Sequence, residues 1–133
     1  MLSPPADYIP GEKPKNDDSL AMRLTYGKNS FLLTGDMEKP SEARLLSDGV
    51  SLRADVLKVG HHGSRTSSSD EFLDAVHPAF AIISDGFENS FGHPHRDVLA
   101  RLTEHHAEIL RTDTVGLVTI RSDGRRLVMT SFR

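Results

Sequence analysis

The segment "VLKVGHHGSRTSSS", Val56 to Ser69, joins an apolar run to a polar one and decides how the chain is interpreted. The apolar run ends at Gly60 and is followed at once by His61 and His62. Successive side chains along a strand point to opposite faces, so adjacent histidines on a strand cannot both face one site. The segment therefore predicts a buried strand that delivers a histidine pair to its carboxyl end.

Composition limits the classes of protein to consider. The 133 residues suffice for one domain with a modest core. The net charge of −3 gives no general basic character of the kind that announces nucleic-acid binding, although a nuclease with a local patch is not excluded. The absence of cysteine excludes disulfides and thiolate metal sites. No apolar run is long enough to cross a bilayer, and no signal-peptide pattern opens the chain.

The chain divides into two parts by composition. Residues 1–18 are rich in proline and predict an extended lead-in without regular structure. Residues 19–133 contain no internal repeat and are interpreted as one unit.

Alternating and buried apolar patterns predict seven strands in that unit. They are expected at residues 20–26, 30–34, 54–60, 80–84, 108–112, 116–121 and 126–132. Gly27-Lys28-Asn29 and Ser122-Asp123-Gly124 predict hairpins at the two ends of the unit.

Three helices are expected between the strands. Pro40 begins a short helix that Gly49 closes, and Ser68 with Glu71 has the spacing of a capping box before a helix that ends near Pro78. A third helix lies in residues 96–107. Together the elements predict an α/β fold with a mixed sheet of about seven strands and about three helices on one face.

Three motifs follow the carboxyl ends of predicted buried strands: Asp36 in "LLTGD", His61 and His62 in "KVGHHGS", and His93 in "FGHPH". In open α/β sheets that edge is where ligands bind. The motifs lie about one strand–helix unit apart, so neighbouring strands can bring them together. Carboxylate and imidazole are ligands for zinc and manganese, which makes this edge a candidate metal site.

Each motif also has a plain structural explanation. Asp36 can be a turn or capping residue, and a histidine pair on a loop is often exposed or bonded to local backbone. His95 fits an exposed position in a first helical turn. His105 and His106 end a helix, where a partly protonated imidazole favours the helix dipole.

The hydroxyl-rich stretch after the histidine pair has two interpretations. It can be a solvated loop followed by a helix cap. Alternatively, Ser64, Arg65 and Thr66 can hold an anionic oxygen.

The chain resembles the carboxyl-terminal part of ComEC-type DNA-internalisation proteins. The resemblance is carried, in order from Asn16 onward, by "NDDSLAMRLTYGKNSFLLTGD", "RADVLKVGHHGSRTSSS" and "GHPH". It implies a metallo-β-lactamase-fold domain, an αββα sandwich, with metal-dependent hydrolase activity as a nuclease for the DNA strand that is not transported. It also implies a parent protein in the inner membrane, with this soluble domain on the extracytoplasmic side and single- or double-stranded DNA as partner.

The resemblance implies roles for individual residues. Asp36 matches the carboxylate that bridges two divalent metals, zinc or manganese. His93 matches the last histidine ligand of the second metal, with His61 and His95 as further metal-ligand alternatives.

His61 and His62 match a catalytic pair at the rim of the metal centre that contacts substrate phosphate. Ser64 and Arg65 are expected beside them as phosphate-binding residues. The pair is therefore expected to face the substrate rather than to supply two metal ligands.

One departure from the family pattern shapes the expectations. The signature His-x-His-x-Asp-His is nowhere in the chain, so only about two protein ligands are expected from it. The chain is expected to be the carboxyl-terminal half of the sandwich, with little catalysis alone. The inner sheet face, carrying Leu32, Leu57, Ile82 and Val118, would then lack its opposing sheet and would pair with the missing amino-terminal half or self-associate.

Three functions remain open at this point. The first is a DNA phosphodiesterase domain of a DNA-uptake protein. The second is another metallo-β-lactamase-fold hydrolase that acts on a phosphoester or a lactone. The third is a metal-poor, non-catalytic scaffold that guides DNA.

Overall fold

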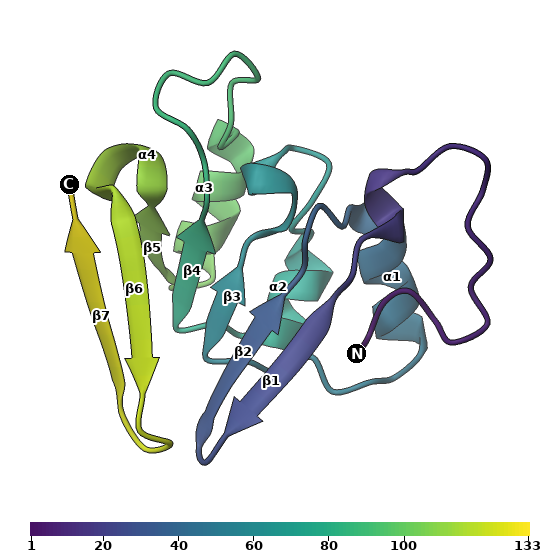
Figure 1. The fold of residues 1–133 in the computed structure, drawn as a ribbon, viewed down its shortest axis with the longest axis horizontal. Helices are drawn as coiled ribbons and strands as arrows, with labels where there is room; N and C mark the ends of the chain where they lie inside the picture. The colour runs from purple at the N-terminus through teal and green to yellow at the C-terminus, as the bar shows by residue number, and fades with distance from the viewer.

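In the computed structural model, which describes residues 1–133, the strands form two separate sheets (Figure 1). The larger has the order β1-β2-β3-β4-β5, with β1 antiparallel to β2 and the remaining pairs parallel. The smaller is the antiparallel hairpin β6-β7. The strands are β1 Met22–Tyr26, β2 Asn29–Leu33, β3 Val56–Lys58, β4 Phe80–Ile83, β5 Glu108–Arg111, β6 Leu117–Ser122 and β7 Leu127–Phe132.

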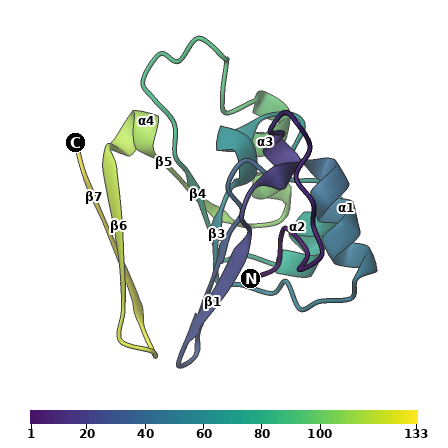
Figure 2. The same ribbon diagram turned by 45° about the vertical axis from the view of Figure 1, so that its right-hand side comes forward.

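Helices cover one face of the larger sheet, and the β6-β7 hairpin lies on the other side (Figure 2). The helices are α1 Lys39–Ser47, α2 Asp70–Val76, α3 Arg96–Glu104 and α4 Thr112–Val115, with short 3-10 helices η1 Asn16–Asp18 and η2 Gly60–Gly63. The sheet side of α1, α2 and α3 therefore forms the core, and α4 connects β5 to β6. No helix is both long and apolar enough to cross a membrane.

The predicted mixed sheet with three helices on one face is confirmed for five strands, but a single sheet of seven is wrong. All seven strands exist, yet β6 and β7 pair as strands only with each other. The tip of their hairpin instead contacts the β1-β2 turn, where Lys28 N–H donates to Gly124 O at 2.6 Å and Ser122 Oγ donates to Asn29 Oδ1 at 2.8 Å. The hairpin is thus a separate layer held at its tip.

The core corrects the expected orientation of the sheet. Leu32, Leu57 and Ala81 lie in register across β2, β3 and β4, and each is 0% exposed among the helix side chains. Leu32 and Leu57 were expected on an uncovered face, but strand alternation puts them on the helix side. Burying each leucine stabilises the fold by roughly 1.5–3 kcal/mol. Ile82 lies on the opposite face and is half-buried, as is Val118 of the hairpin. Self-association through Leu32 and Leu57 is therefore not supported.

Residues 1–18, expected as an extended lead-in, are attached to the fold. Ser3 is buried and forms an isolated antiparallel bridge with Ala21. The η1 turn then places two oxygens against the loop after β2: Asp17 Oδ1 accepts from Glu38 N–H and Ser19 Oγ accepts from Asp36 N–H, both at 3.0 Å. Residues that look like a leader in sequence thus fix a loop of the candidate site.

The cap of α2 is one residue later than predicted. Ser69, not Ser68, is the N-cap, and its side chain accepts from Phe72 N–H at 3.4 Å. Ser68 has φ +57°, whereas an N-cap needs extended backbone such as the φ −64°, ψ 156° of Ser69.

The serine segment is held from both sides by charged groups, the buried Glu42 and the half-buried Arg101. Glu42 accepts from Ser68 N–H at 2.5 Å, Ser69 N–H at 2.9 Å and Ser69 Oγ–H at 2.8 Å. Arg101 donates to Ser68 O at 2.7 Å and to Ser67 O at 3.1 Å. Burial raises the pKa of Glu42, while the hydrogen bonds from Ser68 and Ser69 oppose the rise. Ser67, Ser68 and Ser69 therefore have a structural role, because their backbone and side chains are bonded within the fold.

We expect Glu42→Ala to lower the free energy of unfolding by on the order of 3 kcal/mol, because it leaves buried backbone N–H groups without an acceptor. Chemical denaturation monitored by circular dichroism measures the change. Glu71→Ala, an exposed carboxylate on α2, is the matched control and should change stability by about 0.5 kcal/mol or less. Equal effects from the two variants would contradict the assigned role of Glu42.

Candidate metal and phosphate site

The carboxyl ends of β2, β3 and β4 bring the three predicted motifs together. These strands are parallel neighbours, so the loops that follow them meet at one edge of the sheet. Two backbone hydrogen bonds fasten the loops: His61 N–H donates to Gly35 O at 3.1 Å and His95 N–H donates to Gly63 O at 2.8 Å. The predicted convergence of the three motifs is confirmed.

The histidine pair lies in an unusual backbone conformation. His61 and His62 have φ values of +44° and +53°, in the left-handed region that costs a non-glycine residue about 1–2 kcal/mol. The flanking glycines permit the close approach, because a Cβ on Gly60 would lie 2.7 Å from Met37 O and one on Gly63 would lie 2.6 Å from Pro94 Cβ. Backbone strain of this kind is concentrated at functional sites, and here it occurs at the two residues that carry the candidate catalytic side chains.

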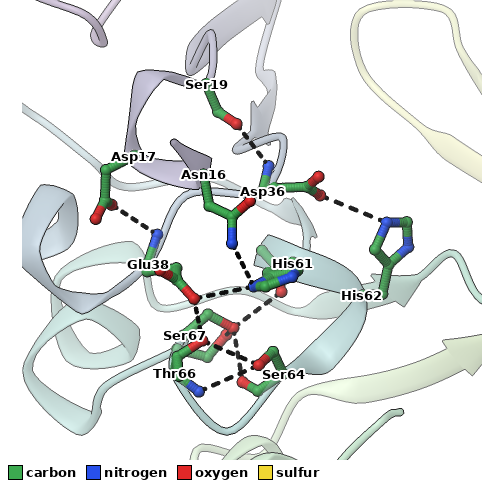
Figure 3. A network of polar contacts seen from close by, with 12 residues as sticks. Asn16, Asp17, Ser19, Asp36, Glu38, His61, His62, Ser64, Thr66 and Ser67 are labelled. Carbon is green, nitrogen blue, oxygen red and sulfur yellow. Dashed lines mark hydrogen bonds and ion pairs between the residues drawn. The ribbon is translucent and has the colours of Figure 1, made fainter. Parts of the chain in front are cut away.

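Glu38 orients His61. Its Oε1 lies 3.1 Å from His61 Nδ1 and also accepts a short hydrogen bond from Thr66 Oγ1 (Figure 3). The hydrogen bond from Thr66, followed by that from His61, lowers the pKa of Glu38, so the carboxylate is ionised near neutral pH. A carboxylate only accepts, so the proton of a neutral His61 lies on Nδ1 and its Nε2 carries the free lone pair. Carboxylates hold metal-binding histidines in this way.

His62 is oriented by a backbone carbonyl. Its Nδ1 lies 2.5 Å from Ser84 O, which can only accept, so Nδ1 carries a proton. Its Nε2 lies 3.4 Å from Asp36 Oδ1 (Figure 3). A neutral ring would present its lone pair to the carboxylate, so the contact is favourable only when a proton or a cation lies between the two atoms. The contact between His62 and Asp36 therefore favours a bound proton or cation.

His93 completes a small pocket. Asp36, His61, His62, Phe91 and His93 line a hollow of about 220 Å³. The ring centroids of His93 and His61 are 5.6 Å apart. Burial first, and then the charge on His61, lowers the pKa of His93, so its ring is neutral near neutral pH and its lone pair is available to a metal or a proton donor.

The donor types fit zinc or manganese, but their number falls short of a closed site. No group of three or more histidine, aspartate or glutamate side chains lies close enough to hold one ion. A firm zinc site takes three or four protein ligands. The roles of Asp36 and His93 as metal ligands therefore remain predictions that depend on further donors.

The predicted phosphate-binding residues do not lie in this pocket. Ser64 is 7% exposed, and its Oγ lies 2.9 Å from Thr66 Oγ1 inside the turn. Arg65 is exposed and lines a separate hollow of about 470 Å³ with Lys39 and Thr66 among its neighbours. Phosphate contact by Ser64 and Arg65 remains a prediction, and the geometry favours Arg65 for it.

His95 serves as the N-cap of α3. Its Nδ1 accepts from Asp97 N–H at 3.3 Å, and its own N–H holds the turn at Gly63. The ring does not line the pocket of Asp36 and His93. A metal-binding role for His95 therefore has no support in this arrangement.

Sequence reasoning missed Glu38 and Asn89. Glu38 lies two residues after Asp36, and a second carboxylate in the same strand-end loop was the available signal. Asn89 accepts from His93 N–H at 3.1 Å and donates to His93 O at 2.6 Å, so it fixes the backbone of the predicted ligand. Nothing in its sequence context distinguished it from other loop asparagines.

The amino-acid sequence is similar to those of several named proteins. The chain matches no protein-family model. It is 42% identical over 125 residues to ComE operon protein 3 of Bacillus subtilis and 40% identical over 111 residues to Competence protein ComA of Neisseria gonorrhoeae. The chain is a homologue of competence proteins. It is also 42% identical over 108 residues to Recombination protein 2 of Haemophilus influenzae.

The similarity covers most of this chain but a small part of each relative. It spans 94%, 80% and 79% of the chain in the three comparisons, and 16%, 16% and 13% of the respective relatives. The similarity to competence proteins expected from the motifs is confirmed.

We expect the stability contributed by Glu38 to depend on pH. Its pKa is lowered in the fold, so the contribution is present above the ordinary glutamate value of about 4.3 and is lost as the pH falls through the lowered value. The difference in unfolding free energy between the wild type and Glu38→Gln should shrink between about pH 5 and pH 3. Urea titrations at several pH values measure it. Glu12→Gln, on the exposed lead-in, should show no such trend.

Proposed function

We propose that the chain is the carboxyl-terminal part of a metal-dependent DNA phosphodiesterase domain, of the metallo-β-lactamase fold, in a protein of DNA uptake. The observation that carries this proposal is the convergence of Asp36, His61, His62 and His93 on one pocket at the ends of three parallel strands. The competence proteins among its homologues support the biological setting. The donor chemistry supports the reaction class, because carboxylate and neutral imidazole suit a divalent metal.

Asp36 and His93 are the proposed metal ligands, and the remaining ligands come from outside this chain. Zinc or manganese, when bound, polarises water and neutralises charge on the phosphoryl oxygens. His93 suits this role because its lowered pKa keeps the ring neutral. Asp36 suits it because its backbone is fixed by Ser19 and its carboxylate already faces a position that favours a cation.

His61 and His62 act on the substrate phosphate. The Nδ1 of each is occupied, by Glu38 and by Ser84 O respectively, so the Nε2 of each is the functional atom. From a protonated Nε2, His62 can donate to a phosphoryl oxygen or to the leaving oxygen. His61 accepts or donates a proton at Nε2 without changing its orientation, because Glu38 holds the ring.

Attraction of DNA must come from local charge, since the net charge of the chain is −3. Lys39 and exposed Arg65 share a hollow with Glu38, the residue that orients His61. They are the proposed backbone contacts beside the site. Location next to the inner membrane, on its extracytoplasmic side, is part of the same proposal.

A second candidate function is a non-catalytic scaffold that guides DNA. The observation that favours it is the absence of three metal-binding side chains around one point. The two candidates differ in a measurable way, because the scaffold binds DNA without metal-dependent turnover.

The test joins this segment to the preceding region of the Bacillus subtilis relative and assays cleavage of end-labelled single-stranded DNA with manganese or zinc. We expect Asp36→Asn and His93→Ala each to reduce turnover by about 100-fold or more, with manganese or zinc content also reduced. His106→Asn, an exposed histidine beyond α3, should leave turnover unchanged.

Full activity in Asp36→Asn would refute the metal assignment. DNA binding with no turnover at any metal concentration would favour the scaffold. Faster hydrolysis of a lactone or a small phosphoester than of DNA would point to another hydrolase.

A further inference from the structure

The loop between β4 and α3 exposes an aromatic ring at the mouth of the site. Phe91 is 81% exposed and lines the pocket of Asp36 and His93. It also lines an adjoining hollow of about 330 Å³, together with Ser84, Asp85 and Asn89. Phe91 thus borders both hollows beside the candidate catalytic histidines.

One face of the Phe91 ring is already occupied. It stacks on His93, with the ring centroids 6.0 Å apart and an interplanar angle of 23°. The ring is otherwise exposed, which leaves flat aromatic surface for a further partner. A single exposed phenylalanine is ordinary on a protein surface, so the position of this ring beside the candidate site carries the argument.

Asn89 holds the loop backbone at Phe91. Its Oδ1 accepts from Phe91 N–H and from His93 N–H, both at 3.1 Å. Its Nδ2 donates to Asp85 Oδ2 at 3.0 Å and to His93 O at 2.6 Å. One side chain therefore sets the backbone of the exposed ring and of the proposed metal ligand together. A loop backbone held this way has less freedom to lose when a ligand binds beside Phe91.

We propose that Phe91 stacks on a nucleobase of single-stranded DNA whose adjacent phosphate faces His61 and His62. Aromatic rings beside a phosphate-binding groove bind single strands in this way, and each stacked base contributes about 1–3 kcal/mol. The bases of a duplex already stack on one another, so the ring selects unpaired strand. This inference rests on the proposed function, because it takes DNA as the substrate, and it adds the form of DNA and the residue that recognises it.

Binding of fluorescently labelled oligonucleotides to the 133-residue chain, in EDTA and at one fixed low salt concentration, tests the proposal. The probes are oligothymidylate and an abasic strand of equal length, which keeps the phosphates and lacks the bases. We expect Phe91→Leu to weaken oligothymidylate binding about five-fold or more and to leave abasic binding unchanged. Phe87→Leu is the matched control, since Phe87 is 69% exposed on the same loop and borders neither hollow; it should bind both probes like the wild type.

A second variant gives a direct readout of stacking. The chain contains no tryptophan, so Phe91→Trp introduces a single tryptophan at the proposed position, and its emission can be excited selectively. Oligothymidylate should quench its emission and the abasic strand should not, while Phe87→Trp should respond to neither. Circular dichroism of each variant shows whether it remains folded.

Equal loss of both probes in Phe91→Leu, or wild-type binding of oligothymidylate by that variant, would overturn the stacking proposal. Neither result would affect the metal-dependent cleavage test, which is carried out with Asp36 and His93 variants. Binding of neither probe by the wild type would overturn stacking and would also remove the support for DNA as the substrate.

Discussion

The parallel pairing of β2, β3 and β4 is the constraint on which the rest of the structure depends. Leu32, Leu57 and Ala81 lie in one row beneath the helices, and this row fixes the register of all three strands. A slip of one residue would turn these side chains away from the core, so the apolar contacts set the positions of the strand ends. The loops that carry Asp36, the histidine pair and His93 therefore meet, because packing of the core fixes the strand ends from which they start.

Around that edge, polar groups of the surrounding loops hold the site residues in place. Glu38 fixes His61, Ser84 O fixes His62, and Asn89 fixes the backbone of His93. The strained backbone of the histidine pair persists because neighbouring loops hold it through hydrogen bonds. A preorganised edge of this kind loses little freedom on meeting a ligand, which is the property expected of a site that stabilises developing charge.

Periodicity predicted the local elements well, since the seven strands and three main helices follow directly from it. The convergence of the three motifs was also predictable, because parallel strands end at a common edge. Which face of the sheet Leu32 and Leu57 occupy was not, because alternation defines two faces without saying which one the helices cover.

The finer contacts of the site were also beyond the sequence. Ser64 and Arg65 are adjacent in the chain, yet one is buried in the turn and the other is exposed. Glu38 and Asn89 act through contacts formed only after folding, so no local pattern marks them. Ser69 rather than Ser68 caps α2, and the backbone at Ser68 is held by Glu42 and Arg101, which lie far away in sequence.

The contact between the two hairpin tips has a consequence for how the chain folds. A Cβ on Gly27 would lie 2.2 Å from Gly124 O, so backbone packs directly on backbone between segments nearly a hundred residues apart. A contact between segments so distant in sequence has a large loop-closure entropy. The contact therefore couples the β6-β7 hairpin to the β1-β2 hairpin, so that segments far apart in sequence belong to one cooperative folding unit.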